Sequence, residues 1–155
     1  MSIPLVLSGI PGRMCREILA ASAEDAWTGR IDLEQVGLAS PRAQLGGTPF
    51  EEWTICDAAT VPVGCIVVDF TTPGAALDNV RAYVANGVSF VMGTTGFDVG
   101  AATHLVRASG VCAVIAPNMA VPIVLALAAA RHLAKRFPNA MEGINATLRE
   151  SHQSA

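Results

Sequence analysis

A glycine-containing turn near the amino terminus has the residue types that bind a phosphate. Residues 8–15, SGIPGRMC, follow a short apolar run and precede residues that recur at helical spacing. Glycines at such a strand-to-helix turn let a pyrophosphate approach the backbone N–H groups that begin the helix. The spacing is G-x-x-G-x-x-C, which lacks the central G-x-G of a dinucleotide fingerprint and has Cys15 at the third glycine. The alternative is an ordinary turn that Pro11 makes rigid.

Ser40 and Arg42 follow the second expected strand, where dinucleotide folds bind the adenosine ribose. An acidic residue at this place accepts hydrogen bonds from ribose hydroxyls, whereas a 2′-phosphate needs donors and positive charge. Residues 39–42 read ASPR, without an acidic residue. We therefore expect NADPH as the cofactor in preference to NADH, with the alternative that Arg42 is a surface-loop arginine.

Two threonine-rich segments follow expected buried strands. They are DFTTP at residues 69–73 and GTTGF at residues 93–97. The carboxyl ends of strands in an open α/β sheet form the edge that binds ligands, and small hydroxylated residues there suit a flat cofactor ring. Thr71 and Thr94 could instead be helix caps or turn formers. Neither segment alone indicates a reaction.

His152 is the histidine with the best prospect of chemistry. An imidazole titrates near neutrality, so it could deliver a proton, although a position near a terminus also favours a frayed end. The four cysteines form no C-x-x-C pair and have no histidines at metal-ligand spacing, so we expect reduced thiols and no metal site.

Strands and helices that would position these residues alternate along the chain. We expect strands at residues 3–8, 33–39, 66–70, 88–92, 111–115 and 144–149. We expect helices after residue 12 and over residues 73–86, 101–108 and 119–136; the segment between 39 and 66 has no clear pattern. Strands that are apolar on both faces indicate a parallel sheet covered by helices. The predicted fold is α/β, a Rossmann-like doubly wound parallel sheet.

Composition excludes several partners. The 155 residues are 52% hydrophobic and 15% charged, with a formal net charge of −3, which is typical of a globular chain without a basic surface for nucleic acid. The longest apolar stretch, residues 119–130, contains Pro122 and is shorter than the roughly 20 residues that cross a bilayer. We expect it to be a buried helix, and we expect no membrane partner.

Five segments together resemble the dihydrodipicolinate reductases, enzymes of lysine and diaminopimelate biosynthesis, in their order and spacing. These segments are GIPGRMC, VVDFTTPGAALDNV, FVMGTTGF, IAPNMA and ESHQ. The similarity runs from Ile3 to the end, and the last part is similar to the plant and cyanobacterial branch. The resemblance implies an NAD(P)H-dependent 4-hydroxy-tetrahydrodipicolinate reductase with a ring dicarboxylate as substrate.

The resemblance also implies a role for each segment. Residues 9–14 would wrap the pyrophosphate, residues 93–95 would line the nicotinamide and its ribose, and residues 70 and 71 would flank the same cleft. Residues 118 and 119 would lie beside the nicotinamide. With the two ribose-side residues, the predicted cofactor-binding set is Gly9, Ile10, Pro11, Gly12, Arg13, Met14, Ser40, Arg42, Phe70, Thr71, Gly93, Thr94, Thr95, Asn118 and Met119.

His152 matches the histidine that protonates the substrate in this family, so it is the predicted catalytic residue. In the family a lysine follows four positions later, and then come a carboxylate-binding segment and a sheet domain. We expect residues 1–136 to form the dinucleotide-binding domain and residues 137–155 to begin a truncated substrate region, with the substrate and oligomerisation domain absent and little reductase activity. Two residues depart from the family pattern. Cys15 is expected to weaken the phosphate contacts of the cofactor, and Pro122 is expected to alter the interdomain hinge and the shape of the cleft.

A rival hypothesis is a non-catalytic dinucleotide-binding or scaffold protein that has lost its substrate domain. An unrelated oxidoreductase with the same fold is disfavoured because both threonine segments lie where this family has them. We expect a cytoplasmic location, or the plastid stroma if a transit peptide was removed. Apolar surface without its second domain also predicts self-association, so a homo-oligomer is among the expected partners.

Overall fold

The computed structural model describes residues 2–23, 31–116, 118–140, 142 and 143. The chain divides into two compact units, residues 1–117 and 118–155, and each is described by itself. The strand expected at residues 144–149 and the candidate His152 lie outside the described residues. The predicted boundary between residues 136 and 137 separates a cofactor-binding domain from a substrate-binding region. This boundary is defined by function and stays a prediction.

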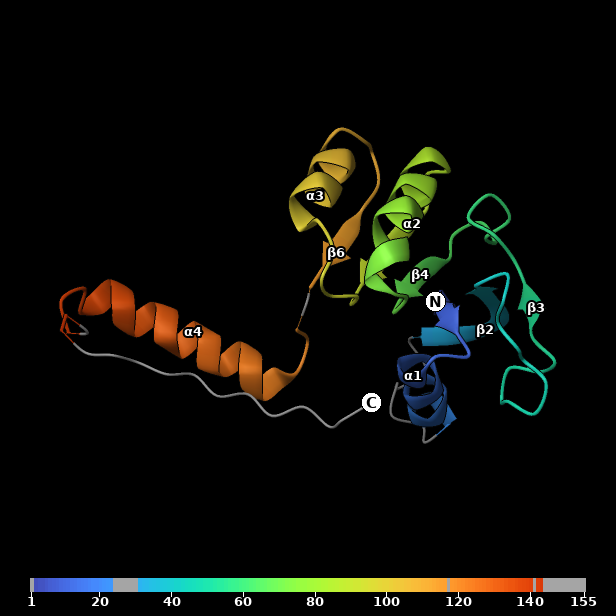
Figure 1. The fold of residues 1–155 in the computed structure, drawn as a ribbon, viewed down its shortest axis with the longest axis horizontal. Helices are drawn as coiled ribbons and strands as arrows, with labels where there is room; N and C mark the ends of the chain where they lie inside the picture. The colour runs from blue at the N-terminus through green and yellow to red at the C-terminus, as the bar shows by residue number, and fades with distance from the viewer. Residues whose placement is uncertain (1, 24–30, 117, 141, 144–155) are drawn as a thin grey trace. The chain divides into compact units, whose positions relative to one another are not determined.

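The first unit is built on a six-stranded parallel sheet (Figure 1). Its strand order is β3-β2-β1-β4-β5-β6, so the order reverses between β1 and β4. This order is typical of the doubly wound sheets that bind dinucleotides, and the predicted fold class is confirmed. The strands are β1 Ile3–Ile10, β2 Ile31–Ala39, β3 Thr54–Ile55, β4 Ile66–Asp69, β5 Ser89–Met92 and β6 Ala113–Ile115.

Helices cover both faces of this sheet. Helix α1 (Arg13–Ala23) packs against β1, whereas α2 (Pro73–Ala85) and α3 (Val99–Arg107) pack against each other and against β5 and β6. Figure 1 shows α1 on one side of the sheet and the α2–α3 pair on the other. Because each strand-to-helix connection returns to a parallel neighbour, the carboxyl ends of all the strands meet at one edge.

Strand β1 has a hydrophobic core on each side. Val6 and Leu7 are adjacent and both are 0% exposed, because successive side chains of a strand point to opposite faces. Val6 belongs to a cluster on the α2–α3 face, where the Tyr83 and Phe90 rings lie 5.2 Å apart. Leu7 belongs to a second cluster on the α1 face, together with Cys15 and further apolar residues. Burial on both faces fixes β1 at the centre of the sheet.

Strand β3 is the element that the sequence pattern did not predict. It has only two residues, Thr54 and Ile55, both exposed, and it pairs with Val36 and Gly37 of β2. A two-residue strand has no alternation that a sequence window could detect. The other strands and helices of this unit lie where they were expected, with small differences at their ends.

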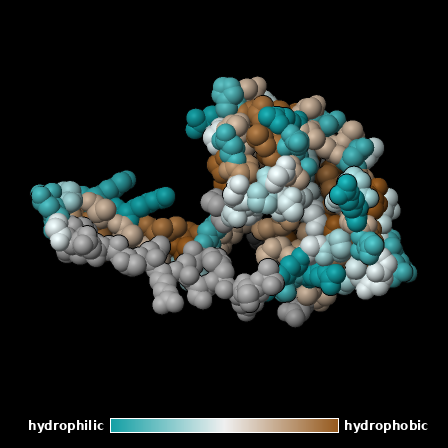
Figure 2. Space-filling view, in the orientation of Figure 1, coloured by the Kyte–Doolittle hydropathy of each residue, from teal (hydrophilic) through white to brown (hydrophobic). Residues whose placement is uncertain are grey.

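The second unit contains one described helix, α4 (Val121–Arg136). Pro122 lies in its first turn, where proline fits because that N–H has no helical partner. Every residue of α4 is exposed, so the expected burial of this helix is not seen among the described residues. Figure 2 shows hydrophobic colour at the start of α4 and hydrophilic colour toward its end. Among the described residues, none of the helices is both long and apolar enough to span a membrane.

Candidate cofactor-binding site

A cavity of about 580 Å³ opens at the carboxyl edge of the sheet, where the strand order reverses. It is lined by residues at the carboxyl ends of β1 and β2, by residues that follow β1, β2, β3 and β4, and by one face of α2. Ligands of open α/β sheets bind at this kind of switch point. The lining residues are Ser8, Gly9, Ile10, Gly12, Leu38, Ala39, Ser40, Pro41, Cys56, Asp57, Ala58, Phe70, Thr71, Thr72, Ala75, Asn79, Ala82 and Tyr83.

The end of β1 and the turn that follows it require glycine at two positions. Gly9 has a φ of +100°, and a Cβ there would lie 2.6 Å from the Phe70 carbonyl oxygen. A Cβ on Gly12 would lie 2.5 Å from the Gly9 carbonyl oxygen, which accepts a 2.8 Å hydrogen bond from the Gly12 N–H. The glycines therefore bring the backbone after β4 against the turn and leave the start of α1 open to a phosphate.

Cys15 is accommodated between α1 and β1. Its side chain is fully buried, and its Sγ lies 3.5 Å from the Ser8 carbonyl oxygen, to which the thiol donates. Burial, and then the nearby Asp69 charge, raise the pKa of the Cys15 thiol to about 12, so the thiol is neutral at physiological pH. Its expected effect on cofactor affinity stays a prediction.

The residues after β2 and β3 form the end of the cavity beside Ser40. The Ser40 Oγ accepts a 3.3 Å hydrogen bond from the Arg42 N–H, and Ser40 lines the cavity while Arg42 is an exposed neighbour. Asp57 also lines this end, although sequence reasoning did not select it. Hydrogen bonds from Thr60 hold the pKa of the Asp57 carboxyl below its usual range, so Asp57 carries a negative charge.

A carboxylate that sequence reasoning did not select lies directly behind the cavity. Asp69 ends β4 and is 0% exposed. Its Oδ1 accepts hydrogen bonds from the Thr71 N–H at 3.0 Å, the Thr71 hydroxyl at 2.8 Å and the Thr94 hydroxyl at 3.3 Å. The carboxylate thus joins the segments that follow β4 and β5.

The other oxygen of Asp69 faces α2 and β1. Oδ2 accepts hydrogen bonds from the Tyr83 hydroxyl at 2.7 Å, the Asn79 amide at 3.0 Å and the Ser8 hydroxyl at 3.1 Å. All of the buried side-chain polar atoms described in the structure have a hydrogen-bond partner. A signal for this network was present in the sequence. It is an acidic residue at the end of a buried strand, followed by Asn79 and Tyr83, which lie four residues apart on one helix face.

The segment after β5 brings its residues to the same edge. A Cβ on Gly93 would lie 2.1 Å from Cε1 of the Phe70 ring, so the ring rests where a side chain would be. The Thr94 hydroxyl also lies within hydrogen-bonding distance, 3.3 Å, of the Thr71 carbonyl oxygen. Thr95 is exposed. Phe70, Thr71, Gly93 and Thr94 thus come together as predicted, while their binding of a cofactor stays a prediction.

The remaining predicted residues lie on α1 or in the second unit. Arg13 and Met14 begin α1 and are exposed. Asn118 and Met119 precede α4, and the Asn118 Oδ1 accepts a 3.0 Å hydrogen bond from the Ala120 N–H. Among the described residues there is no group of three or more His, Cys, Asp or Glu side chains placed to hold a metal ion.

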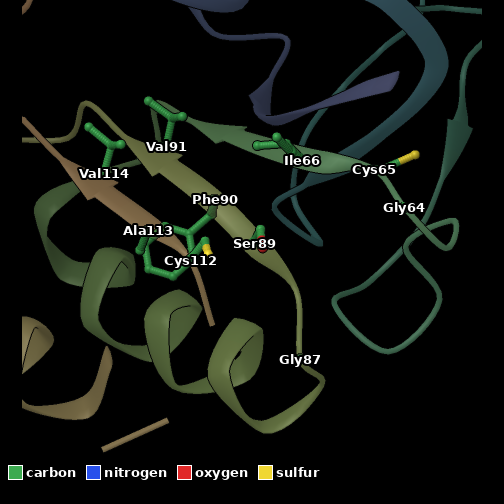
Figure 3. Close-up of a pocket in the computed structure, with 10 residues that line it drawn as sticks. All are labelled: Gly64, Cys65, Ile66, Gly87, Ser89, Phe90, Val91, Cys112, Ala113 and Val114. Atoms are coloured by element: carbon green, nitrogen blue, oxygen red, sulfur yellow. The ribbon is translucent and has the colours of Figure 1, made fainter. Parts of the chain in front are cut away.

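A second hollow, of about 430 Å³, lies along β4, β5 and β6. Figure 3 shows Phe90 turned toward a helix, with Val91 and Val114 on the opposite side of the sheet. The hollow is lined mainly by apolar groups and two thiols, without a charged side chain that could orient a ligand. The lining residues are Gly64, Cys65, Ile66, Gly87, Ser89, Phe90, Val91, Cys112, Ala113 and Val114.

Comparison with known proteins gives one consistent family. The family described as dihydrodipicolinate reductase, N-terminus, matches residues 3–119. A chloroplastic 4-hydroxy-tetrahydrodipicolinate reductase 1 of Arabidopsis thaliana is 31% identical over 99% of this chain and 46% of its own length. A 4-hydroxy-tetrahydrodipicolinate reductase of Streptococcus pneumoniae is 30% identical over 90% of this chain and 54% of its own length. The chain thus spans about half the length of these curated relatives.

A solved structure has the same fold. A dipicolinate-bound dihydrodipicolinate reductase from a Paenisporosarcina species aligns with a TM-score of 0.68, over 89% of this chain and 56% of that one. The two sequences are 24% identical. At this identity the likeness concerns the fold, and it agrees with the strand order and helix layers described above.

Proposed function

This chain belongs to the dihydrodipicolinate reductase family, and we propose that it is the cofactor-binding part of a 4-hydroxy-tetrahydrodipicolinate reductase. The observation that supports this proposal most directly is the cavity at the reversal of strand order, with a glycine turn at its edge. A nicotinamide dinucleotide is the ligand that such a site takes. The family is shown by the match to residues 3–119, whereas the activity is our proposal.

The described residues fit a dinucleotide at the phosphate end. A side chain at Gly12 would fill the space above the Gly9 carbonyl, so glycine keeps the start of α1 accessible. Backbone N–H groups and the helix dipole there favour the pyrophosphate. When bound, the reduced cofactor supplies a hydride, and in this proposal Phe70, Thr71 and Thr94 bind the ring that carries it.

We further propose that NADPH binds more tightly than NADH. Ser40 lines the cavity, and Arg42 extends from the same turn, so a hydroxyl and a guanidinium are available to a 2′-phosphate. Asp57 lines the same end and would repel that phosphate, so the preference requires Arg42 to outweigh it.

The proposed substrate is a ring dicarboxylate, and His152 is the proposed proton donor. The solved structure is of a dipicolinate-bound enzyme, which supports the substrate class, and the resemblance of residues 150–153, ESHQ, to the family supports the histidine. Reduction would need the groups that clamp the carboxylates in addition to the cofactor cleft. We also propose that the enzyme is a homo-oligomer located in the plastid stroma or the cytosol. The Arabidopsis relative is chloroplastic by name.

Calorimetric titration with NADPH and NADH tests the proposal. The test variant is Gly12→Asp, in which a carboxylate and its Cβ enter the phosphate end. Gly110→Asp is the matched control, because it adds the same charge at a glycine with no heavy atom within 4 Å of the added Cβ. We expect wild type and Gly110→Asp to bind and Gly12→Asp to lose binding. Failure of the wild-type chain to bind either nucleotide would favour a scaffold protein.

A further inference from the structure

Asp69 is a buried acid with no exposed surface, yet four residues that line the cavity donate hydrogen bonds to it. Ser8, Thr71, Asn79 and Tyr83 all line the cavity, and each has a donor within 3.1 Å of an Asp69 oxygen. Thr94 donates from the next segment. The acid therefore lies one side chain behind the cavity wall, at the point where β1, β4 and α2 meet.

The six donors satisfy Asp69 without cancelling its charge. Three donors face each oxygen, and all six are neutral hydroxyl, amide or backbone N–H groups. Such a donor set is the environment of a carboxylate rather than of a neutral acid. Its charge acts on its neighbours, since it contributes to raising the pKa of both Cys15 and Tyr83.

The Asp69 carboxylate contacts residues that the proposed function assigns to the nicotinamide end of the dinucleotide. Oδ1 holds Thr71 and Thr94, which are the threonines assigned to the nicotinamide ring in the proposed function. A nicotinamide ring is neutral when reduced and carries a positive charge when oxidised. A buried negative charge beside the ring therefore distinguishes the two forms, because charges in a poorly hydrated site interact more strongly than in water.

We propose that Asp69 is a positioning residue whose buried charge favours the oxidised, positively charged nicotinamide over the reduced ring. The inference rests on the proposed function, because it needs the ring to bind beside Thr71 and Thr94. Asp69 acts on the ring in two ways: it holds the threonine hydroxyls in place, and its field stabilises the positive charge that develops as a hydride leaves for the substrate.

Binding affinities test this inference without any enzymatic turnover. The first comparison uses the wild-type chain with NAD⁺ and with benzamide adenine dinucleotide, which has nearly the same shape but a neutral ring. We expect NAD⁺ to bind about fivefold more tightly than the neutral-ring analogue, because only the positively charged ring is attracted by the Asp69 carboxylate. Equal affinities would overturn the inference. This arm does not depend on the folding of any variant.

The second comparison uses Asp69→Asn, which has nearly the same shape and lacks the charge. The expected result is a ratio near one for the two dinucleotides and a matching loss of preference for NAD⁺ over NADH. Asp78→Asn is the control, because it removes an exposed carboxylate from helix α2, where Asp78 pairs with Arg81. It should keep the wild-type ratio. A wild-type ratio in a folded Asp69→Asn chain would overturn the inference.

A titration with ADP-ribose, which lacks the nicotinamide, separates this role from a general effect on phosphates. Because Ser8, beside the glycine turn, also donates to Asp69, ADP-ribose measures any change at the phosphates, and we expect Asp69→Asn to lower the affinity for NAD⁺ relative to that for ADP-ribose. An equal gain in affinity for ADP-ribose, NAD⁺ and NADH would show that the charge only repels phosphate, and this would overturn the inference. Absence of all binding by the wild-type chain would instead overturn the proposed function.

Discussion

The hydroxyl of Tyr83 donates a 2.7 Å hydrogen bond to Asp69 Oδ2, and it also lies 2.9 Å from the Ser8 Oγ. This contact joins the middle of α2 to the ends of β1 and β4, three elements that form the wall of the cavity. The Tyr83 side chain is 0% exposed and packs on Phe90. Burial, and then the Asp69 charge, raise the pKa of Tyr83, so the phenol remains a donor across the usual pH range.

Removal of this hydroxyl should destabilise the fold while leaving the ring packing intact. Tyr83→Phe deletes one donor to a buried carboxylate, and we expect a loss of about 1.5–3 kcal/mol in the free energy of unfolding. Urea denaturation followed by circular dichroism measures the loss. Thr103→Val is the control, because it deletes a hydroxyl on the exposed side of α3 and should change stability by less than about 0.5 kcal/mol. Equal effects of the two variants would contradict the prediction.

Alkaline pH should destabilise the chain through Cys15. Its pKa rises from 9.0 to about 12 on folding, so between these values the unfolded thiol loses its proton while the folded one keeps it. The unfolded state is then favoured, and the free energy of unfolding should fall as the pH rises above about 9, by at most about 1.4 kcal/mol per pH unit from this group. Below pH 9 this contribution is fully present.

Urea denaturation at pH 8, 9 and 10 measures this slope. Cys15→Ala lacks the thiol, so its stability should fall less steeply over the same range, even though the smaller side chain lowers its stability at every pH. Cys112→Ala removes an exposed thiol and should keep the wild-type slope. Parallel slopes for wild type and Cys15→Ala would show that another group causes the alkaline loss.

The sequence predicted the sheet and its helices because their periodicity is strong. Strands such as β4 are short apolar runs between turn residues, and α2 has Ala76, Val80 and Tyr83 on one buried face. Strand β3 has no such pattern, since its pairing with β2 depends on backbone hydrogen bonds from two exposed residues. The exposure of α4 could not be predicted either, because apolar side chains favour burial but do not specify which residues they contact.

The sequence predicted the segments at the cavity better than the contacts behind it. Gly9, Phe70 and Thr71 line the cavity as their place at strand ends indicated. Asp69 was visible as part of the DFTTP segment, yet its burial depends on donors from Ser8 and from helix α2, far along the chain. Contacts of this kind depend on three-dimensional register, which motif spacing does not specify.

Gly9→Ala should weaken both the fold and nucleotide binding. A side chain at φ +100° is strained, and its Cβ would lie 2.6 Å from the Phe70 carbonyl oxygen. We expect a loss of about 2 kcal/mol or more in stability, together with weaker binding of NADPH and NADH, because the turn must move. Thermal denaturation and calorimetry measure the two effects. Gly110→Ala has open space around its Cβ and should behave as wild type.

Arg42→Ala should alter cofactor preference rather than cofactor binding in general. Loss of a guanidinium bond to a 2′-phosphate would weaken NADPH binding about tenfold or more, whereas NADH has no such phosphate and should bind within about twofold of wild type. Calorimetric titration with both nucleotides gives the ratio of the NADPH affinity to the NADH affinity. Arg107→Ala removes an exposed arginine from α3 and should leave the ratio unchanged. If Arg42→Ala weakened both nucleotides equally, the proposed recognition of the 2′-phosphate would be wrong.

Exposed apolar side chains on α4 predict self-association of this chain. Val121, Leu125 and Leu133 are 66%, 63% and 56% exposed, which leaves a largely apolar surface along the helix. Such surfaces drive association, because contact between copies removes them from water. Light scattering over a range of concentrations should show a mass that rises above 16.0 kDa. Leu125→Glu places a charge on this surface and should shift the equilibrium toward the monomer, whereas Arg107→Glu on α3 should not. A wild-type mass that stays at 16.0 kDa at high concentration would contradict the prediction.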